Sequence, residues 1–66
     1  MILEFFPLAD VKEETASRIE FYLDSADENL SVTVNRMLNK LKFEFSLIER
    51  TKDFRIHVIL KKEDNL

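Results

Sequence analysis

Hydrophobic and polar residues follow two different periods along this chain. Between residues 11 and 41 apolar residues recur every three or four positions, which is typical of amphipathic helices. Between residues 43 and 60 they alternate with polar residues, which is typical of strands with one buried face. Residues 2–6 are rich in Ile, Leu and Phe, and Pro7 follows them. Because Pro has no N–H to donate and is tolerated at a strand end, we expect a terminal strand there.

Two helices are predicted between that strand and the alternating region. Asp10 and Glu13 form a capping-box pattern, which predicts a helix over residues 11–24. Its apolar face would consist of Thr15, Ala16, Ile19, Tyr22 and Leu23. Residues 25–28 repeat the capping pattern and should begin a second helix. The stripe of that second helix would consist of Ala26, Leu30, Val34, Met37, Leu38 and Leu41.

The segment 30–34 has a second interpretation. Its residues alternate and are rich in β-branched side chains, so a strand competes with the helix there. The helix is favoured, because the apolar stripe continues for three further turns and begins at a cap.

The alternating region predicts a β-hairpin. Strands over 43–48 and 54–60 would be joined by residues 49–53, with a four-residue loop over 49–52. The expected register places three pairs opposite one another: Leu47 with Phe54, Phe45 with Ile56, and Glu44 with His57. In this register Ile48 and Ile59 lie on the outer, solvent-facing side of the sheet.

These elements predict an α+β fold with the order β-α-α-β-β. Two helices would pack on one face of a three-stranded sheet that ends in the hairpin. The strand over 54–60 is the most apolar, so we expect it in the centre with the N-terminal strand beside it. Residues 1–62 would form a single domain, and residues 63–66 a short polar tail.

Composition narrows the possible chemistry. With 66 residues the chain forms one domain whose core is thin, and its lack of Cys excludes disulfides and thiolate metal sites. Its lack of Gly excludes the glycine-rich phosphate loops and leaves tight turns to other residues. No apolar run is long enough to span a membrane. The N-terminal segment has no basic residue and meets Glu4 early, unlike a signal peptide, so a cytoplasmic location is expected.

Candidate catalytic and metal-binding residues are few. His57 is the only histidine, and we expect it to be exposed and dispensable beside Glu44 across the hairpin. The many carboxylates of the first predicted helix suit a solvated acidic face better than a cation site, because no calcium-loop spacing is present. The sequence therefore predicts a protein that is not an enzyme and that has no cofactor and no metal.

Charge is unevenly divided along the chain. Residues 1–30 carry two basic and eight acidic side chains, whereas residues 31–62 carry eight basic and three acidic ones. Lys42, Arg55 and Lys61 would lie on the outer face of the hairpin as possible phosphate contacts. Binding of nucleic acid is therefore the alternative function, although the chain as a whole has a net charge of −3.

Apolar residues on the wrong faces favour a different function. Phe21 would point away from the apolar face of the first helix, among Glu14 and Arg18, and Val32 is similarly displaced on the second helix. Together with Ile48 and Ile59, we expect these six residues to contact a protein partner or a second subunit. The sequence thus predicts a small interaction module of the regulator or inhibitor type. It would act through an apolar and acidic helical surface, as a homodimer and without membrane contact.

Overall fold

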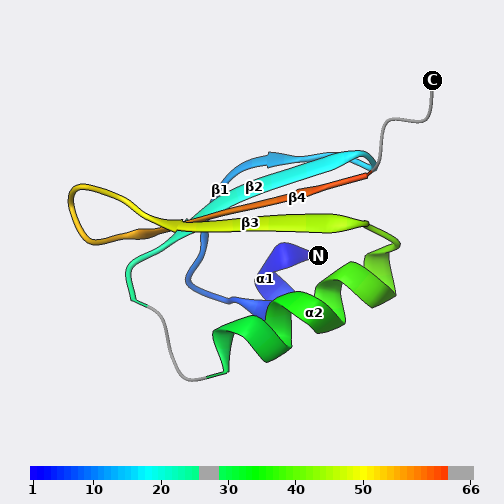
Figure 1. Cartoon of the computed structure of the whole chain (residues 1–66), viewed down its shortest axis with the longest axis horizontal. Helices are drawn as coiled ribbons and strands as arrows, with labels where there is room; N and C mark the ends of the chain where they lie inside the picture. Colours follow the sequence, from blue (N-terminus) through cyan, green and yellow to red (C-terminus); the bar gives the residue numbers. More distant parts are fainter. Residues whose placement is uncertain (26–28, 63–66) are drawn as a thin grey trace.

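The computed structural model describes residues 1–25 and 29–62. Its elements are α1 (Ile2–Phe5), β1 (Asp10–Glu14), β2 (Arg18–Leu23), α2 (Leu30–Leu41), β3 (Phe45–Arg50) and β4 (Ile56–Lys61). The four strands form one antiparallel sheet in the order β1-β2-β4-β3 (Figure 1). The α+β class is confirmed. The predicted three strands and two long helices are wrong, because the sheet has four strands and one main helix.

Both helices cover the same face of the sheet, and the opposite face is open (Figure 1). Alternate residues of the two central strands point toward the helices and are buried: Ile19, Phe21 and Leu23 of β2, and Ile56, Val58 and Leu60 of β4. Phe21 lies in the middle of this layer, opposite Val58 on β4, with its ring centroid 5.4 Å from that of Phe6. We call the open side of the sheet the outer face.

The predicted helix over 11–24 is a β-hairpin instead. In residues 18–23 polar and apolar side chains alternate, and the strand buries every second one. Thr15 closes the turn between β1 and β2, because its hydroxyl oxygen accepts hydrogen bonds from the N–H groups of Ser17 and Arg18. This side-chain turn competes with the helix that Asp10 and Glu13 were expected to cap.

The predicted N-terminal strand is a single helical turn. The Phe6 N–H donates to the Ile2 carbonyl oxygen at 2.9 Å, and Ile2 is fully buried in the core. Pro7 disfavours helical geometry at the residue before it, and Phe6 has an extended φ of −133°. The apolar run 2–6 therefore reaches the core as a short helix rather than as a strand beside β4.

Helix α2 confirms the preferred interpretation of the segment 30–34. Leu30, Val34 and Met37 are buried, as the predicted stripe requires. The helix ends at Lys42, which takes a left-handed conformation with φ 64° and thus occupies a position that usually carries Gly. The predicted cap over 25–28 and the stripe residue Ala26 lie wholly or partly outside the described residues, as does the predicted tail 63–66.

The C-terminal hairpin and the central place of β4 are confirmed, but the register is different. Leu47 pairs with Ile59 rather than with Phe54, and His57 is opposite Glu49 rather than Glu44. Phe54 belongs to the loop, where it adopts a φ of 65°. The partner of Leu47 is therefore residue 59 instead of residue 54, which is an odd shift. An odd shift turns every side chain of β3 to the face of the sheet opposite to the one predicted.

This inversion of β3 is tolerated because β3 is an edge strand. All six of its residues are exposed, so burial does not select one facing. Phe45 and Leu47 consequently lie on the outer face, and Ile48 lies on the helix side opposite Val58. The predicted outer position of Ile48 is therefore wrong, whereas that of Ile59 is correct. No helix within residues 1–25 and 29–62 is long and apolar enough to cross a membrane.

Substitution of Phe21 by Ala should leave most of the chain unfolded at 25 °C. Truncating a buried Phe costs about 3–5 kcal/mol, and the core of so small a domain rarely supplies more than about 3–5 kcal/mol. Val32→Ala, on the exposed side of α2, should change the free energy of unfolding by less than about 0.5 kcal/mol. Far-UV circular dichroism during heating measures both effects. A cooperative transition of the Phe21 variant close to that of the parent would contradict this account of the core.

Candidate functional site

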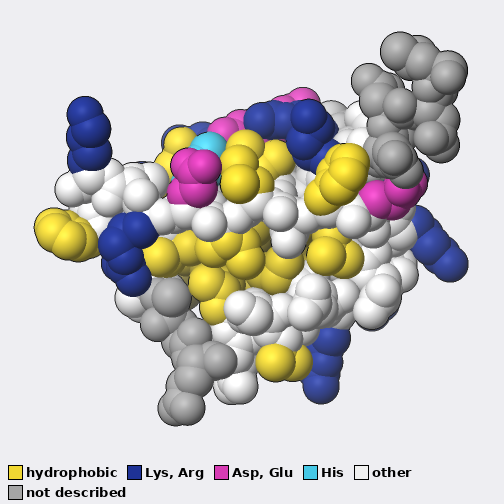
Figure 2. All heavy atoms as spheres, viewed as in Figure 1, with side chains coloured by type: hydrophobic (Ala, Val, Ile, Leu, Met, Phe, Trp, Pro, Cys, Tyr) yellow, Lys and Arg dark blue, Asp and Glu magenta, His cyan; other side chains and the backbone are white. Residues whose placement is uncertain are grey.

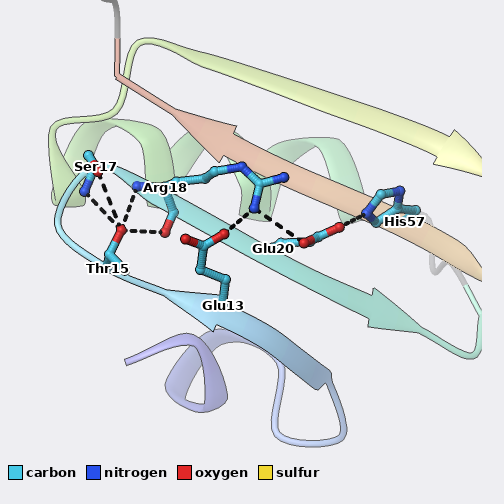
Figure 3. A network of polar contacts seen from close by, with 6 residues as sticks. All are labelled: Glu13, Thr15, Ser17, Arg18, Glu20 and His57. Carbon is cyan, nitrogen blue, oxygen red and sulfur yellow. Dashed lines mark hydrogen bonds and ion pairs between the residues drawn. The ribbon is translucent and has the colours of Figure 1, made fainter.

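The outer face carries the densest group of polar interactions in the described part of the chain. Arg18 on β2 forms ion pairs with Glu13 on β1 and, at 3.2 Å, with Glu20 on its own strand (Figure 3). Glu20 in turn accepts a hydrogen bond of 2.6 Å from Nε2 of His57 on β4. A continuous row of polar contacts therefore links three neighbouring strands.

A second group of contacts continues from His57 toward the other end of the sheet. The imidazole stacks on the Tyr22 ring, with centroids 4.4 Å apart. The Arg55 guanidinium lies over the same phenol ring, 4.8 Å from its centroid, and Nη2 of Arg55 donates to Asp10 at 3.1 Å. Its Nε is 3.5 Å from an oxygen of Asp24, which is an ion-pair distance rather than a good hydrogen bond.

These contacts shift several ionisation equilibria. The hydrogen bond from His57 is the main reason that the pKa of Glu20 is lowered, with Arg18 adding to the effect and partial burial opposing it. The hydrogen bonds from Arg55 and then Lys12 lower the pKa of Asp10. Both carboxylates are therefore held in their charged forms, so the network consists of neutralised pairs rather than free charges.

An apolar patch lies beside this network, at the β3 side of the outer face. It consists of Phe45, Leu47 and Ile59, where Leu47 and Ile59 are directly opposite each other on neighbouring strands. Phe45 and Leu47 are 48% and 49% exposed. The patch borders a shallow depression that Arg18 and Lys61 also line. In Figure 2, hydrophobic side chains gather on both sides of the β3 backbone.

The structure separates the residues that were expected to form a helical binding surface. Phe21 is fully buried on the helix side of β2, so its predicted exposure is wrong. Glu14 is on β1, where it pairs with the N-terminal ammonium at 3.5 Å, and Arg18 belongs to the outer-face network. Val32 is exposed on α2, as predicted, but it lies on a different element from the other three.

The three predicted phosphate contacts also lie apart. Lys42 ends α2, and Lys61 is on the outer face opposite Phe45, at the end of β4. Arg55 precedes the other end of β4, where it is paired with carboxylates. Arg55 and Lys61 are thus on the outer face, as predicted, but at opposite ends of β4, and the three basic side chains do not form one cluster.

The environment of His57 differs from the one predicted. The ring is on the outer face, as expected, but it packs against Tyr22 and hydrogen bonds to Glu20 rather than Glu44. Its side chain is only 20% exposed. Residues 1–25 and 29–62 contain no group of three or more His, Cys, Asp or Glu side chains that could hold a metal ion.

Phe45 and Leu47 were missed as surface residues because the hairpin register was placed wrongly. The sequence did contain a pattern that indicates a strand, rather than a helix, at β2. Phe21 follows Ile19 by two positions and precedes Leu23 by two, which is a strand period. Its poor fit to the helical face was therefore a sign of the strand rather than of a binding site.

The lowered pKa of Glu20 predicts a stability that depends on pH. Below about pH 4.5, the ordinary pKa of a glutamate, the unfolded chain takes up a proton that the folded chain still excludes. The contribution of Glu20 is therefore complete above that pH and is lost as the pH falls through its lowered pKa. Urea unfolding between pH 2 and 6 should show a shallower pH dependence for Glu20→Gln than for the parent. Glu4→Gln, at an exposed site on α1, serves as the control for the change in charge. Equal slopes for parent and Glu20→Gln would refute the prediction.

Comparison of the chain with protein-family models, with curated proteins and with solved structures gives no significant match. No relative therefore indicates which of these groups is functional. The outer face is distinguished by its own geometry: it is the side of the sheet that α1 and α2 leave open, and it brings together a charged network and an apolar patch.

Proposed function

We propose that this protein is a small non-enzymatic interaction module that binds a protein partner through the apolar patch of its outer face. The observation that carries the proposal is the exposure of Phe45 and Leu47 beside Ile59 on an uncovered sheet surface. This placement replaces the helical surface expected from the sequence, because Phe21, Glu14 and Arg18 lie on strands.

The composition of the patch supports a protein partner. An aromatic ring and two aliphatic side chains form its centre, and Arg18 and Lys61 border it. Apolar anchors surrounded by charged side chains are typical of protein interfaces, in which a few central residues provide most of the binding free energy. The depression beside the patch can receive a side chain from the partner.

The charges of the outer face argue for protein rather than nucleic acid. Arg18 is paired with Glu13 and Glu20, and Arg55 is paired with Asp10 and Asp24. A phosphate would have to displace these carboxylates, which lie on the same surface. The negative net charge of the chain adds to this repulsion.

A binding role also suits the contacts of His57 better than a catalytic one. Its Nε2 forms a hydrogen bond with Glu20, and its ring stacks on Tyr22. Neither Glu20 nor Tyr22 is a strong nucleophile that His57 could activate. The network instead keeps the sheet surface rigid beside the patch. A pre-formed surface of this kind loses little conformational entropy on binding.

The substitution Phe45→Lys should abolish capture of the partner without unfolding the chain. A central aromatic anchor contributes about 2 kcal/mol or more, or roughly a 30-fold change in affinity. The tagged parent, Phe45→Lys and Val32→Lys are compared by affinity capture from extract with and without nuclease treatment, followed by mass spectrometry. Circular dichroism confirms that each variant is folded.

The position of the control makes the result specific to the outer face. Val32 is as exposed as Phe45 but belongs to α2, on the other side of the sheet. A protein that is captured by the parent and by Val32→Lys, but not by Phe45→Lys, supports the proposal. Equal capture by all three proteins, or material that disappears on nuclease treatment, would contradict it.

A further inference from the structure

We propose that a second copy of this chain pairs with the free edge of β3, strand against strand in antiparallel orientation, so that the two sheets become one. This inference concerns the edge of the sheet, whereas the proposed function concerns its outer face. It goes beyond the proposed function in naming a specific partner and in predicting a register.

The two edges of the sheet differ in how they resist pairing. Strand β1 carries four charged side chains in five residues and has an irregular register between Val11 and Glu13. Charges and bulges are the usual protection of an edge strand. Strand β3 pairs regularly with β4 along its whole length, and three of its six residues are Phe45, Leu47 and Ile48. Within the described residues, only the β3 edge is thus regular and apolar.

The backbone of β3 has donors and acceptors directed outward. The Thr51 N–H donates to the Arg55 carbonyl oxygen at 2.8 Å, in register with the Arg50–Ile56 pair. Because backbone groups alternate in an antiparallel ladder, the N–H and C=O groups of Ser46, Ile48 and Arg50 point away from β4. In the described chain no strand pairs with this edge.

Symmetry restricts the possible registers. A two-fold axis perpendicular to the sheet keeps the outer faces of both copies on the same side, so outer-face residues must pair with outer-face residues. One register places Leu47 opposite Leu47 of the second copy, with Ser46 and Ile48 exchanging hydrogen bonds across the axis. The registers on either side are less favourable: one places Leu47 opposite Glu49 and forms no apolar pair on the outer face, and the other aligns only residues 45–47 of the two strands.

Overlap of the strands also favours the register centred on Leu47. It aligns residues 45–49 of the two strands and makes an apolar pair at its centre, with Phe45 of each copy opposite Glu49 of the other. The outer-face patches of both copies also meet, because Leu47 lies at the axis and Phe45 of each copy is a diagonal neighbour of Leu47 of the other. A second copy therefore offers β3 an identical regular edge, with outward N–H and C=O groups and an apolar residue opposite Leu47.

Removal of one outward-pointing N–H tests the pairing itself. Pro is tolerated at an edge position whose N–H faces solvent, so Ile48→Pro should remain folded while it loses hydrogen bonds to the second copy. Ile48→Ala keeps the N–H and controls for loss of the side chain. Sedimentation equilibrium of the purified chains across the micromolar range should show dimers for the parent and for Ile48→Ala, and monomers for Ile48→Pro. A monomeric parent, or a dimer of Ile48→Pro as tight as that of the parent, would overturn the proposal.

Disulfide formation tests the register. The natural chain has no Cys, so a single introduced Cys reports one distance between the copies. In the proposed register the Leu47 Cα atoms are a non-hydrogen-bonded pair about 4.5 Å apart, which is within the range of a disulfide. Leu47→Cys should therefore oxidise to a covalent dimer much faster than Ile48→Cys or Val32→Cys. Faster cross-linking of Ile48→Cys would overturn the assigned register.

The two proposals fail in different experiments. Dimerisation is measured with the purified chain alone, whereas the proposed function is measured by capture of a different protein. A monomeric parent that still captures a partner through Phe45 would overturn the pairing and leave the interaction module intact. A dimer whose captured proteins do not depend on Phe45 would give the opposite result.

Discussion

The structure depends on the burial of one side of β2 and β4 beneath the two helices. Ile19, Phe21 and Leu23 alternate with Arg18, Glu20 and Tyr22, so the strand that supplies the centre of the core also supplies the polar network of the outer face. Because side chains alternate with a strict period of two, neither face can change its residues without changing the other. The positions of Arg18, Glu20 and His57 on the outer face thus follow from which residues of β2 and β4 are buried.

The outer face, which neither α1 nor α2 covers, carries paired polar side chains over most of its area and apolar side chains at one edge. Over β1, β2 and most of β4, carboxylates are matched with Arg18, Arg55 and His57. Exposed ion pairs contribute little to stability individually, but they keep such a surface soluble. Among the described residues, the paired charges do not extend to β3, where Phe45 and Leu47 are exposed on the outer face. Within one continuous sheet, the outer face therefore changes from paired polar groups to exposed apolar residues, and the proposed function concerns the apolar part.

Much of the C-terminal half could be predicted from the sequence, because its periods are unambiguous. The stripe of α2 extends over three turns, and the alternation of β4 identifies its buried residues correctly. The prediction for the N-terminal half was wrong because Asp10 and Glu13 have the spacing of a capping box although no helix follows them. The turn that forms instead depends on the Thr15 hydroxyl group, and no distinctive sequence pattern marks it. The candidate site required the hairpin register. That register leaves Phe54 in the loop with a positive φ, a conformation that no sequence rule assigns to a bulky aromatic residue.

The order of the strands has a consequence for how the chain folds. Both outer ladders, β1–β2 and β3–β4, join segments that are close in sequence, and each can form after closing only a short loop. The central ladder joins β2 to β4, so it brings together segments from the two halves of the chain across the whole of α2. Because such non-local contacts are slow to form, docking of the two hairpins should limit the folding rate. Until that step, the inner sides of both central strands remain uncovered, and the interval between hairpin formation and docking is when the chain is most exposed to aggregation.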